Sequence, residues 1–245
     1  MTALDGLVAA LPPIALDELN ARAALLRRVD SKYFAPRAAL AELLEAIPEL
    51  RVLEIGGHRS FRYRTVYYDS AAFTHYREHV QGRRHRFKVR VRTYCDSGDC
   101  MLEVKSKGYR GQTVKDRRPR GPRHPDALDA DERAFVSSIT GRDAAVLRPV
   151  LETVYDRTTL CAGDQRITLD TDLTCAAGDR RGRGPDDVLV ETKSPDGRTG
   201  LDRALVHAGV RPHSVSKYCV AAALLYPQLP RNRWHRTLQR SFALV

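Results

Sequence analysis

The sequence predicts an α+β fold in which eight antiparallel strands form a β-barrel with a charged interior, flanked by amphipathic helices. Three observations support this fold: strands that alternate apolar and ionic residues, short polar turns between strands, and helical stretches with one apolar face. A chain of 245 residues is long enough for one such domain. Its net charge of +11 favours an anionic partner.

The clearest strand is RHRFKVRVRTY at 84–94, where Phe87, Val89 and Val91 share one face and cations share the other. The same alternation recurs along the chain, which is more than an isolated solvated strand would produce. The other stretches are 28–34, 61–69, 101–107, 112–118, 149–160, 166–174 and 188–194. The turns DSGD, KGYRGQ and AGDQ are typical of antiparallel connections.

Amphipathic helices are expected at 37–47, 126–141 and 200–209. Two arrangements of the strands are open. Ionic faces turned outward would leave an ordinary apolar core, whereas ionic faces turned inward would need an anion, a metal or water between them. Because the helices need an apolar surface to pack on, and the outside of the second barrel offers one, we expect the ionic faces to point inward.

The five cysteines have no zinc-type spacing and are expected to be reduced, although Cys95 and Cys100 flank a turn where they could face each other. No apolar run approaches the length of a membrane helix, and the N-terminus lacks the basic start of a signal peptide. A cytoplasmic location is therefore the expectation.

A series of motifs carries a family resemblance. Along the chain these are RRVDSKYF, TVYYDS with FTHYREH, KVRVRTY, MLEVKSK, VYDRTTL, RITLDTDL, LVETKS and SVSKY. In this order they resemble the VTC domain, the polyphosphate polymerase branch of the triphosphate tunnel metalloenzymes, which is related to the CYTH group. The resemblance spans 20–226 and leaves an N-terminal segment, 1–19, and a basic tail, 227–245. The tail is expected to be a flexible arm, a membrane-surface contact or a solvated segment.

The resemblance implies a triphosphate tunnel that transfers the γ-phosphate of ATP onto a polyphosphate chain beside Mn²⁺ or Mg²⁺. The residues that it implies for catalysis are Lys32, Arg90, Arg92, Lys105, Lys115, Arg157, Lys193 and Lys217. Glu191 is the implied metal ligand, with an ion pair to Lys193 as the alternative, and Glu103 is either a second ligand or an ion-pair partner of Lys105. Further substrate-binding candidates on the strands are Arg62, Arg64, Lys88 and Arg117.

Two other functions are open. A triphosphatase of the same fold would use water as the acceptor, but RVDSK at 28–32 replaces the Glu-x-Glu-x-Lys of many tunnel enzymes, and the lost carboxylate weakens this case. An RNA- or polyanion-binding module would need exposed aromatic side chains between its cations. Tyr63, Tyr67 and Phe87 are instead expected on apolar faces, so no nucleic acid partner is expected.

The expected partners are ATP and polyphosphate or pyrophosphate. The family's eukaryotic transporter complexes have membrane helices that this chain lacks, so we expect any link to a membrane to come from a separate membrane protein. The oligomeric state is left open by the sequence.

Overall fold

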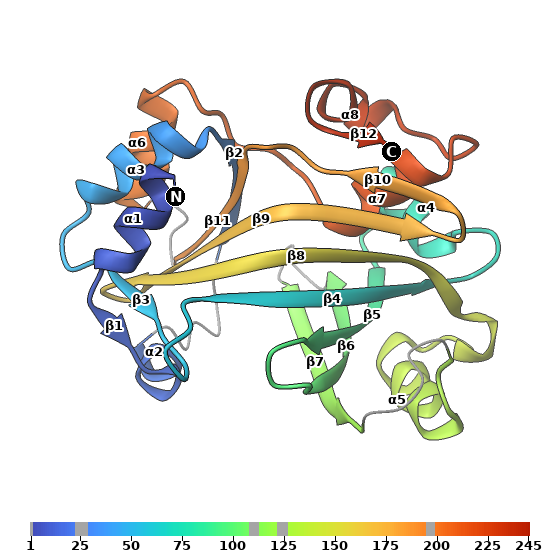
Figure 1. The fold of residues 1–245 in the computed structure, drawn as a ribbon. Coiled ribbons are helices and arrows are strands. Elements are labelled where there is room, and N and C mark those ends of the chain that lie inside the picture. Colours follow the sequence, from blue (N-terminus) through green and yellow to red (C-terminus); the bar gives the residue numbers. More distant parts are fainter. Residues whose placement is uncertain (1, 23–28, 108–112, 122–126, 195–198) are drawn as a thin grey trace. The chain divides into compact units, whose positions relative to one another are not determined.

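The computed structural model describes residues 2–22, 29–107, 113–121, 127–194 and 199–245 (Figure 1). All the predicted strands are present. They are β2 (Val29–Ala35), β4 (Ser60–Asp69), β5 (Arg86–Tyr94), β6 (Cys100–Lys107), β7 (Thr113–Arg120), β8 (Arg148–Ala162), β9 (Gln165–Ala177) and β11 (Val188–Ser194). Most of the predicted KGYRGQ turn, and residues 28, 112 and 126 at the start of predicted elements, lie outside the described residues.

The predicted helices are also confirmed, as α3 (Arg37–Glu45), α5 (Ala130–Thr140) and α6 (Gly200–His207). Several elements were not predicted. They are α1 (Ala3–Ala10), α2 (Leu16–Arg22), α4 (Thr74–Val80), α7 (Lys217–Leu225), α8 (His235–Ser241), the short strands β1 (Pro13–Ile14), β3 (Arg51–Leu53), β10 (Arg180–Arg183) and β12 (Ala243–Leu244), and 3₁₀ turns at Ala144–Val146 and Asn232–Trp234. None of the described helices combines the length and the apolarity that crossing a bilayer requires.

The strands form one hydrogen-bonded series in the order β2-β11-β9-β8-β4-β5-β6-β7. A barrel closes only when its first and last strands pair. Among the described residues β2 and β7 do not pair, so the predicted barrel is an open antiparallel sheet by its hydrogen bonds. Pro119 in β7 has no backbone N–H to donate, which suits a strand at the end of a sheet.

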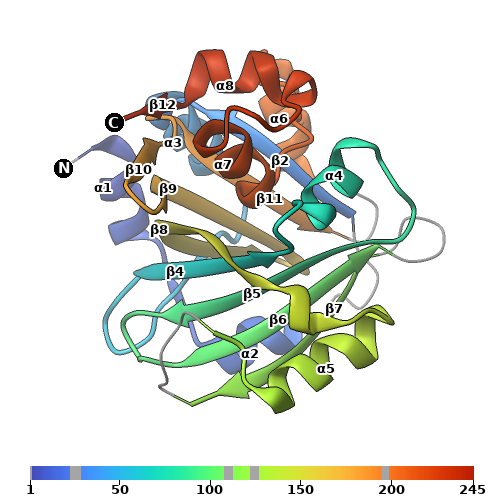
Figure 2. The same ribbon diagram turned by 90° about the vertical axis from the view of Figure 1, so that its right-hand side faces the viewer.

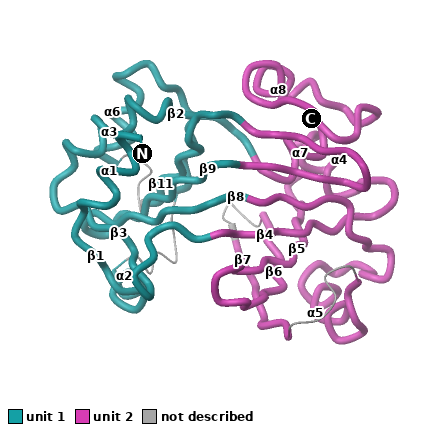
Figure 3. The backbone as a smooth tube through the Cα atoms, viewed as in Figure 1, with its two compact units in different colours: residues 1–61, 155–172, 185–215 teal, residues 62–154, 173–184, 216–245 magenta. Residues whose placement is uncertain are grey.

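The chain divides into two compact units (Figure 3). Unit 1 contains residues 1–61, 155–172 and 185–215, and unit 2 contains 62–154, 173–184 and 216–245. The long strands β8 and β9 contribute residues to both units. Each unit has its own apolar core, and the two cores are described separately.

The core of unit 1 lies between α1, α3 and α6 and one face of β2, β9 and β11. The strand residues in this core come from alternate positions: Tyr33, Ala35, Ile167, Leu169, Val188 and Val190. They meet helix residues such as Leu40, Leu44 and Leu205, all of them buried. The apolar parity of these strands therefore faces the helices, as the sequence predicts.

The core of unit 2 is built in the same way. Helix α5 lies along β6 (Figure 2), and its Val136 packs with strand residues of one parity. Those strand residues are Val66, Tyr68, Phe87, Val89, Val91, Leu102 and Val104. Because side chains alternate between the faces of a strand, the cations of β5 and β6 lie on the face away from α5.

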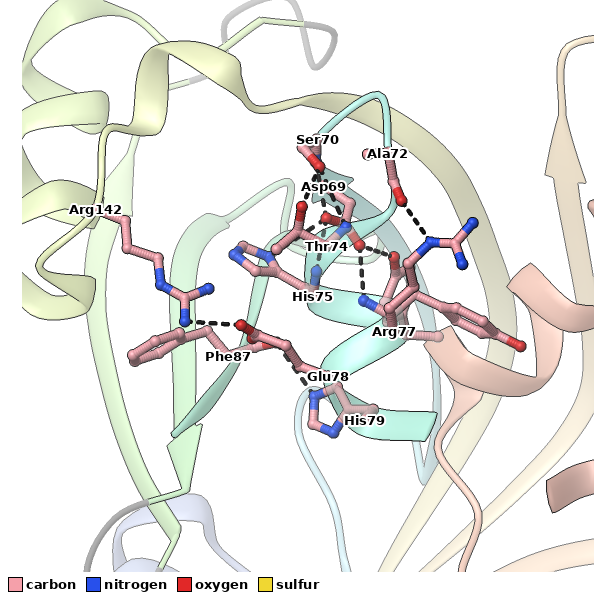
Figure 4. A network of polar contacts seen from close by, with 12 residues as sticks. Asp69, Ser70, Ala72, Thr74, His75, Arg77, Glu78, His79, Phe87 and Arg142 are labelled. Atoms are coloured by element: carbon pink, nitrogen blue, oxygen red, sulfur yellow. Dashed lines mark hydrogen bonds and ion pairs between the residues drawn. The ribbon is translucent and has the colours of Figure 1, made fainter. Parts of the chain in front are cut away.

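A buried carboxylate, Asp69 at the end of β4, joins α4 and α7 to the sheet. It accepts hydrogen bonds from the backbone N–H groups of Ser70, His75 and Tyr76 at 2.7, 3.0 and 2.9 Å, and another from the hydroxyl of Tyr218. Figure 4 shows this network around the start of α4. Asp69 thus caps a helix that has no apolar stripe in its sequence.

The far end of α4 is also held by polar contacts. The ring of His79 lies 3.2 Å from the carbonyl oxygen of Phe87, and Arg142 pairs with Glu78 at 2.7 Å (Figure 4). Burial lowers the pKa of His79 to about 2, so this histidine is neutral at physiological pH. Helix α4 is therefore fixed to β5 as well as to β4.

The C-terminal segment folds onto unit 2, unlike the flexible arm among the expectations for it. Trp234 is buried with its ring centroid 5.7 Å from that of Tyr76, and β12 pairs with β10. The three buried apolar residues of the segment, Leu229, Trp234 and Leu238, supply the contact that a purely basic sequence would lack.

All five cysteines are free thiols, as predicted. In the β5–β6 register Cys100 lies opposite Thr93, so Cys95 and Cys100 do not face each other across the turn.

Replacing Asp69 by Ala is expected to lower the free energy of unfolding by about 3 kcal/mol, because several buried donors lose their acceptor. Tyr218→Phe removes a single hydrogen bond and is expected to cost about 1 kcal/mol. Urea unfolding followed by circular dichroism measures both values. Equal losses for the two variants would contradict the central role given to the carboxylate.

Candidate active site

Unit 2 carries a continuous ionic face on β5, β6 and β7. Residues directly opposite each other in neighbouring strands project to the same side of a sheet. In this register Lys88 faces Lys105, Arg90 faces Glu103, Lys105 faces Lys115, and Glu103 faces Arg117. Seven predicted site residues are thereby brought together: Lys88, Arg90, Arg92, Glu103, Lys105, Lys115 and Arg117.

Glu103 is the acidic centre of this face. Its carboxylate is fully buried, with Oε2 2.6 Å from Nη2 of Arg90 and Oε1 3.2 Å from Nζ of Lys115. Burial alone would raise the pKa of Glu103, but the charges of Arg90, Arg92 and Lys115 outweigh it and hold the pKa well below its usual range. Glu103 is therefore ionised.

The surroundings of Glu103 do not fit a metal ligand. Both carboxylate oxygens already accept from cationic groups, and a divalent cation would have to enter beside three positive side chains. Of the two roles open to Glu103, the contacts support the ion pair, although with Arg90 and Lys115 in place of Lys105.

One carboxylate cannot balance the cations of this face. Arg92 is only 8% exposed, and its Nε has no hydrogen-bond partner among the described residues. The buried hydroxyl of Thr65, opposite Arg92 in the register, lacks one too. Unsatisfied buried donors beside excess positive charge indicate a place for an anion or for ordered water.

Unit 1 carries a second ionic face, in which acids and bases are matched. Arg157 on β8 forms a two-point pair with Asp170 on β9, with Nε–Oδ1 and Nη2–Oδ2 distances of 2.5 and 2.8 Å. On β11, Nζ of Lys193 lies 2.8 Å from Oε1 of Glu191. The register adds Lys32 of β2, directly opposite Glu191. Four more predicted residues, Lys32, Arg157, Glu191 and Lys193, are thus brought together.

Lys193 titrates near physiological pH. Its burial lowers the pKa to about 8, with Arg157 acting in the same direction and Glu191 opposing both. The hydroxyl of Thr168, opposite Glu191 in the register, is buried without a hydrogen-bond partner among the described residues. This face therefore also contains polar groups that an added ligand could satisfy.

Arg62 and Arg64 do not belong to either ionic face. In the β4–β5 register Arg64 lies opposite Thr93, on the side of Val66 and Val91, and it pairs with Glu152 at 2.5 Å. Arg62 has the same parity as Arg64 and is exposed. The prediction that both share the phosphate-binding surface is not supported, because β4 turns its other parity towards the cations.

Two aromatic residues of β4, Tyr63 and Tyr67, lie with the cations, contrary to their expected place on the apolar face. Tyr63 lies under Arg92, with 5.4 Å between the guanidinium carbon and the ring centroid. Tyr67 lies opposite Arg90 and stacks on Tyr218 at 5.1 Å. The alternation of side chains along β4 identifies Tyr63 and Tyr67 as members of this face once the register with β5 is known. The composition of the strand alone does not.

Lys217 is the first residue of α7 and is half-buried. The next residue, Tyr218, contacts Tyr67 on the ionic face of unit 2 and Asp69 at the end of β4. Helix α7 therefore begins at the SVSKY motif, beside the cation-rich face of unit 2.

Comparisons with known proteins agree with this architecture. A family model described as VTC domain matches residues 27–226. The chain belongs to the VTC domain family. The resemblance read from the motifs is thereby confirmed, and the fold of this VTC domain is of the triphosphate tunnel type.

Solved structures resemble the VTC domain at low identity. A protein named "putative adenylate cyclase" from Bacillus halodurans is 10% identical with a TM-score of 0.52, over 78% of this chain and 94% of that chain. A Pyrococcus horikoshii protein is 14% identical with a TM-score of 0.47, over 78% and 96%. A Hippeastrum protein described by a dominant triphosphatase activity is 16% identical with a TM-score of 0.46, over 83% and 99%. The similarity to the Bacillus halodurans protein shows that the two proteins share a fold and nothing more. A search of the curated proteins found no match.

Replacing Glu103 by Gln is expected to lower the free energy of unfolding at neutral pH by about 3 kcal/mol, because buried cations lose their counter-charge. Since the folded-state pKa of Glu103 is depressed, its stabilisation is full above the ordinary carboxylate pKa and is lost on acidification. Wild type and variant should therefore converge in acid. Glu152→Gln, which breaks the more exposed pair with Arg64, is the control and should cost under about 1 kcal/mol. Denaturant titrations at two pH values test this, and a similar loss for both variants would contradict it.

We expect Lys193 to take part in binding tripolyphosphate, so the affinity should fall as the pH rises through about 8, where the Lys193 ammonium loses its charge. Lys193→Arg stays charged across this range, so its affinity should change little. Calorimetric titrations between neutral and mildly alkaline pH make the comparison. A pH dependence of the same size in the arginine variant would assign the titration to another group.

Proposed function

We propose that this VTC domain is a polyphosphate polymerase that transfers the γ-phosphate of ATP onto a polyphosphate chain. The observation that carries the proposal is the cation-rich face of unit 2, where six cations surround one carboxylate, Glu103. Within the part of the chain that the structure describes, the buried donors Arg92 Nε and Thr65 Oγ1 on this face have no hydrogen-bond partner. A polyanion would neutralise this face and satisfy those donors. Membership of the VTC family supports phosphoryl chemistry on such a surface.

The reaction needs no nucleophile from the protein. A terminal phosphate oxygen of the chain attacks the γ-phosphorus of ATP, a new P–O bond forms, the bond to the β–γ bridging oxygen breaks, and ADP leaves. Such transfers pass through a loose in-line transition state, in which positioning and charge neutralisation supply the catalysis. Arg90, Arg92, Lys105 and Lys115 are proposed to hold the phosphates, with Lys88, Arg117 and Lys217 at the borders of the face. On unit 1, the residues proposed to hold phosphates are Lys32, Arg157 and Lys193.

Glu191 is the residue proposed to hold Mn²⁺ or Mg²⁺. Its Oε1 lies 2.8 Å from Nζ of Lys193, and Asp170, the acid that pairs with Arg157, is bound at both of its oxygens. A carboxylate has about four lone-pair sites, and Mg²⁺ commonly takes only one or two carboxylates together with substrate phosphates. Glu191 therefore fits a hard cation. When bound, the ion would supply charge neutralisation on the phosphate oxygens.

A nucleic-acid-binding role is less well supported. Single-stranded nucleic acids bind on exposed aromatic rings set between cations. The aromatic side chains on the ionic face of unit 2 are instead engaged: Tyr67 is 3% exposed and stacks on Tyr218, and Tyr63 contacts Arg92. The proposed partners are therefore ATP and polyphosphate. We propose a cytoplasmic location, and any link to a membrane would be made by a separate membrane protein.

Incubation with ATP and Mn²⁺ tests the function through its product. Long polyphosphate and ADP are expected, and release of orthophosphate alone would identify a triphosphatase. Lys105→Ala should reduce turnover at least about 100-fold, because a cation facing the transferred charge is lost. Arg118→Ala is the matched control, since Arg118 is on β7 but faces the ring of Phe135 on α5. A purified chain that neither binds nor turns over ATP would contradict the proposal.

A further inference from the structure

A second basic surface lies outside the ionic faces, on unit 2. It consists of exposed arginines from the α4–β5 turn and from the C-terminal segment, and we name it the basic ridge: Arg83, Arg84, Arg233, Arg236 and Arg240. The two segments touch, because Nη1 of Arg233 donates to the carbonyl oxygen of His79 at 3.1 Å. The C-terminal segment, which carries three of these arginines, is therefore held against the end of α4, just before Arg83.

The two segments that supply the basic ridge have only positive charges, since neither 79–94 nor 227–245 contains an aspartate or a glutamate. On α8, Arg236 and Arg240 are four residues apart and share one helix face, while Leu238 is buried. Ordinary solvated segments mix charges of both signs, so two contacting segments with only positive charges indicate an anionic partner.

The basic ridge connects to the ionic face along a single strand. Arg86, the first residue of β5, donates to the carbonyl oxygen of Arg83 in the turn. Lys88, Arg90 and Arg92 follow on the same side of β5, about 7 Å apart. Cations thus continue from the proposed phosphate-binding residues to the surface of unit 2.

We propose that the basic ridge binds the polyphosphate chain beyond the active face. This inference rests on the proposed polymerase function and adds to it a track for the long product. A triphosphate is short and is neutralised by the ionic face, whereas a polymer with a charge on every phosphate needs cations further along its length. Guanidinium groups suit phosphate oxygens, because they donate in pairs.

Two features disfavour other polyanions at the basic ridge. Trp234, the only tryptophan of the chain, is 4% exposed and offers no face for stacking a base. Helix α8 turns its apolar Leu238 into the protein, whereas a helix that lies on a membrane presents its apolar side outward. Inorganic polyphosphate requires neither an exposed aromatic ring nor an outward-facing apolar side of a helix.

The test compares long-chain polyphosphate with tripolyphosphate on the purified full chain. In the double variant Arg236→Gln/Arg240→Gln, the affinity for long-chain polyphosphate should fall roughly tenfold, and the salt dependence should weaken, because two phosphate contacts are lost. The affinity for tripolyphosphate should stay within about twofold, which also reports that the variant is folded. Arg133→Gln/Arg211→Gln, which removes two exposed arginines elsewhere, is the charge-matched control.

Arg236→Lys/Arg240→Lys keeps the positive charge and should retain most of the long-chain affinity. The proposal is overturned if the Gln double variant binds long-chain polyphosphate like wild type, if the charge-matched control loses as much, or if tripolyphosphate affinity falls equally. It is also overturned if binding of single-stranded RNA or of phosphatidylserine vesicles is lost while polyphosphate binding is unchanged. If the wild-type protein binds neither long-chain polyphosphate nor tripolyphosphate, the proposed function itself is refuted. If it binds tripolyphosphate but does not bind long-chain polyphosphate more tightly, only the proposed role of the basic ridge is refuted.

Discussion

The structure depends on the separation of apolar and ionic side chains onto opposite faces of the strands. In unit 1 the apolar parity packs under α1, α3 and α6, and in unit 2 it packs under α5. The ionic parity is then left on the other face, where desolvated charges must be balanced. How each unit achieves this balance determines what its face is able to bind.

The two ionic faces achieve the balance differently. In unit 1, Arg157 pairs with Asp170 and Lys193 pairs with Glu191, so these two bases each have an acid. In unit 2, Glu103 is surrounded by Arg90, Arg92 and Lys115, and the net charge is strongly positive. The face of unit 1 therefore contains acids and bases in pairs, whereas the face of unit 2 has an excess of bases around one acid.

Two of the family motifs have a structural explanation in the contacts of Asp69. This residue ends the YYD motif, caps α4 and accepts a hydrogen bond from Tyr218 of the SKY motif. Tyr218 in turn stacks on Tyr67, which lies opposite Arg90. The aromatic and acidic residues of these motifs therefore hold helices against the strands that carry the cations, and the start of α7 is fixed beside them.

The sequence by itself determined the strands, three of the helices and the ionic character of one strand face, because the period of alternating residues is a local property. Only the tertiary structure decided which parity of β4 joins the cations. Both parities of that strand contain large polar or basic side chains, so its register with β5, not its composition, excluded Arg64 and included Tyr63. The pairing of Asp69 with Tyr218, 149 residues away, and the fold of the C-terminal segment onto α4 were likewise decided by packing between distant parts of the chain. Such contacts leave no periodic signal in the sequence.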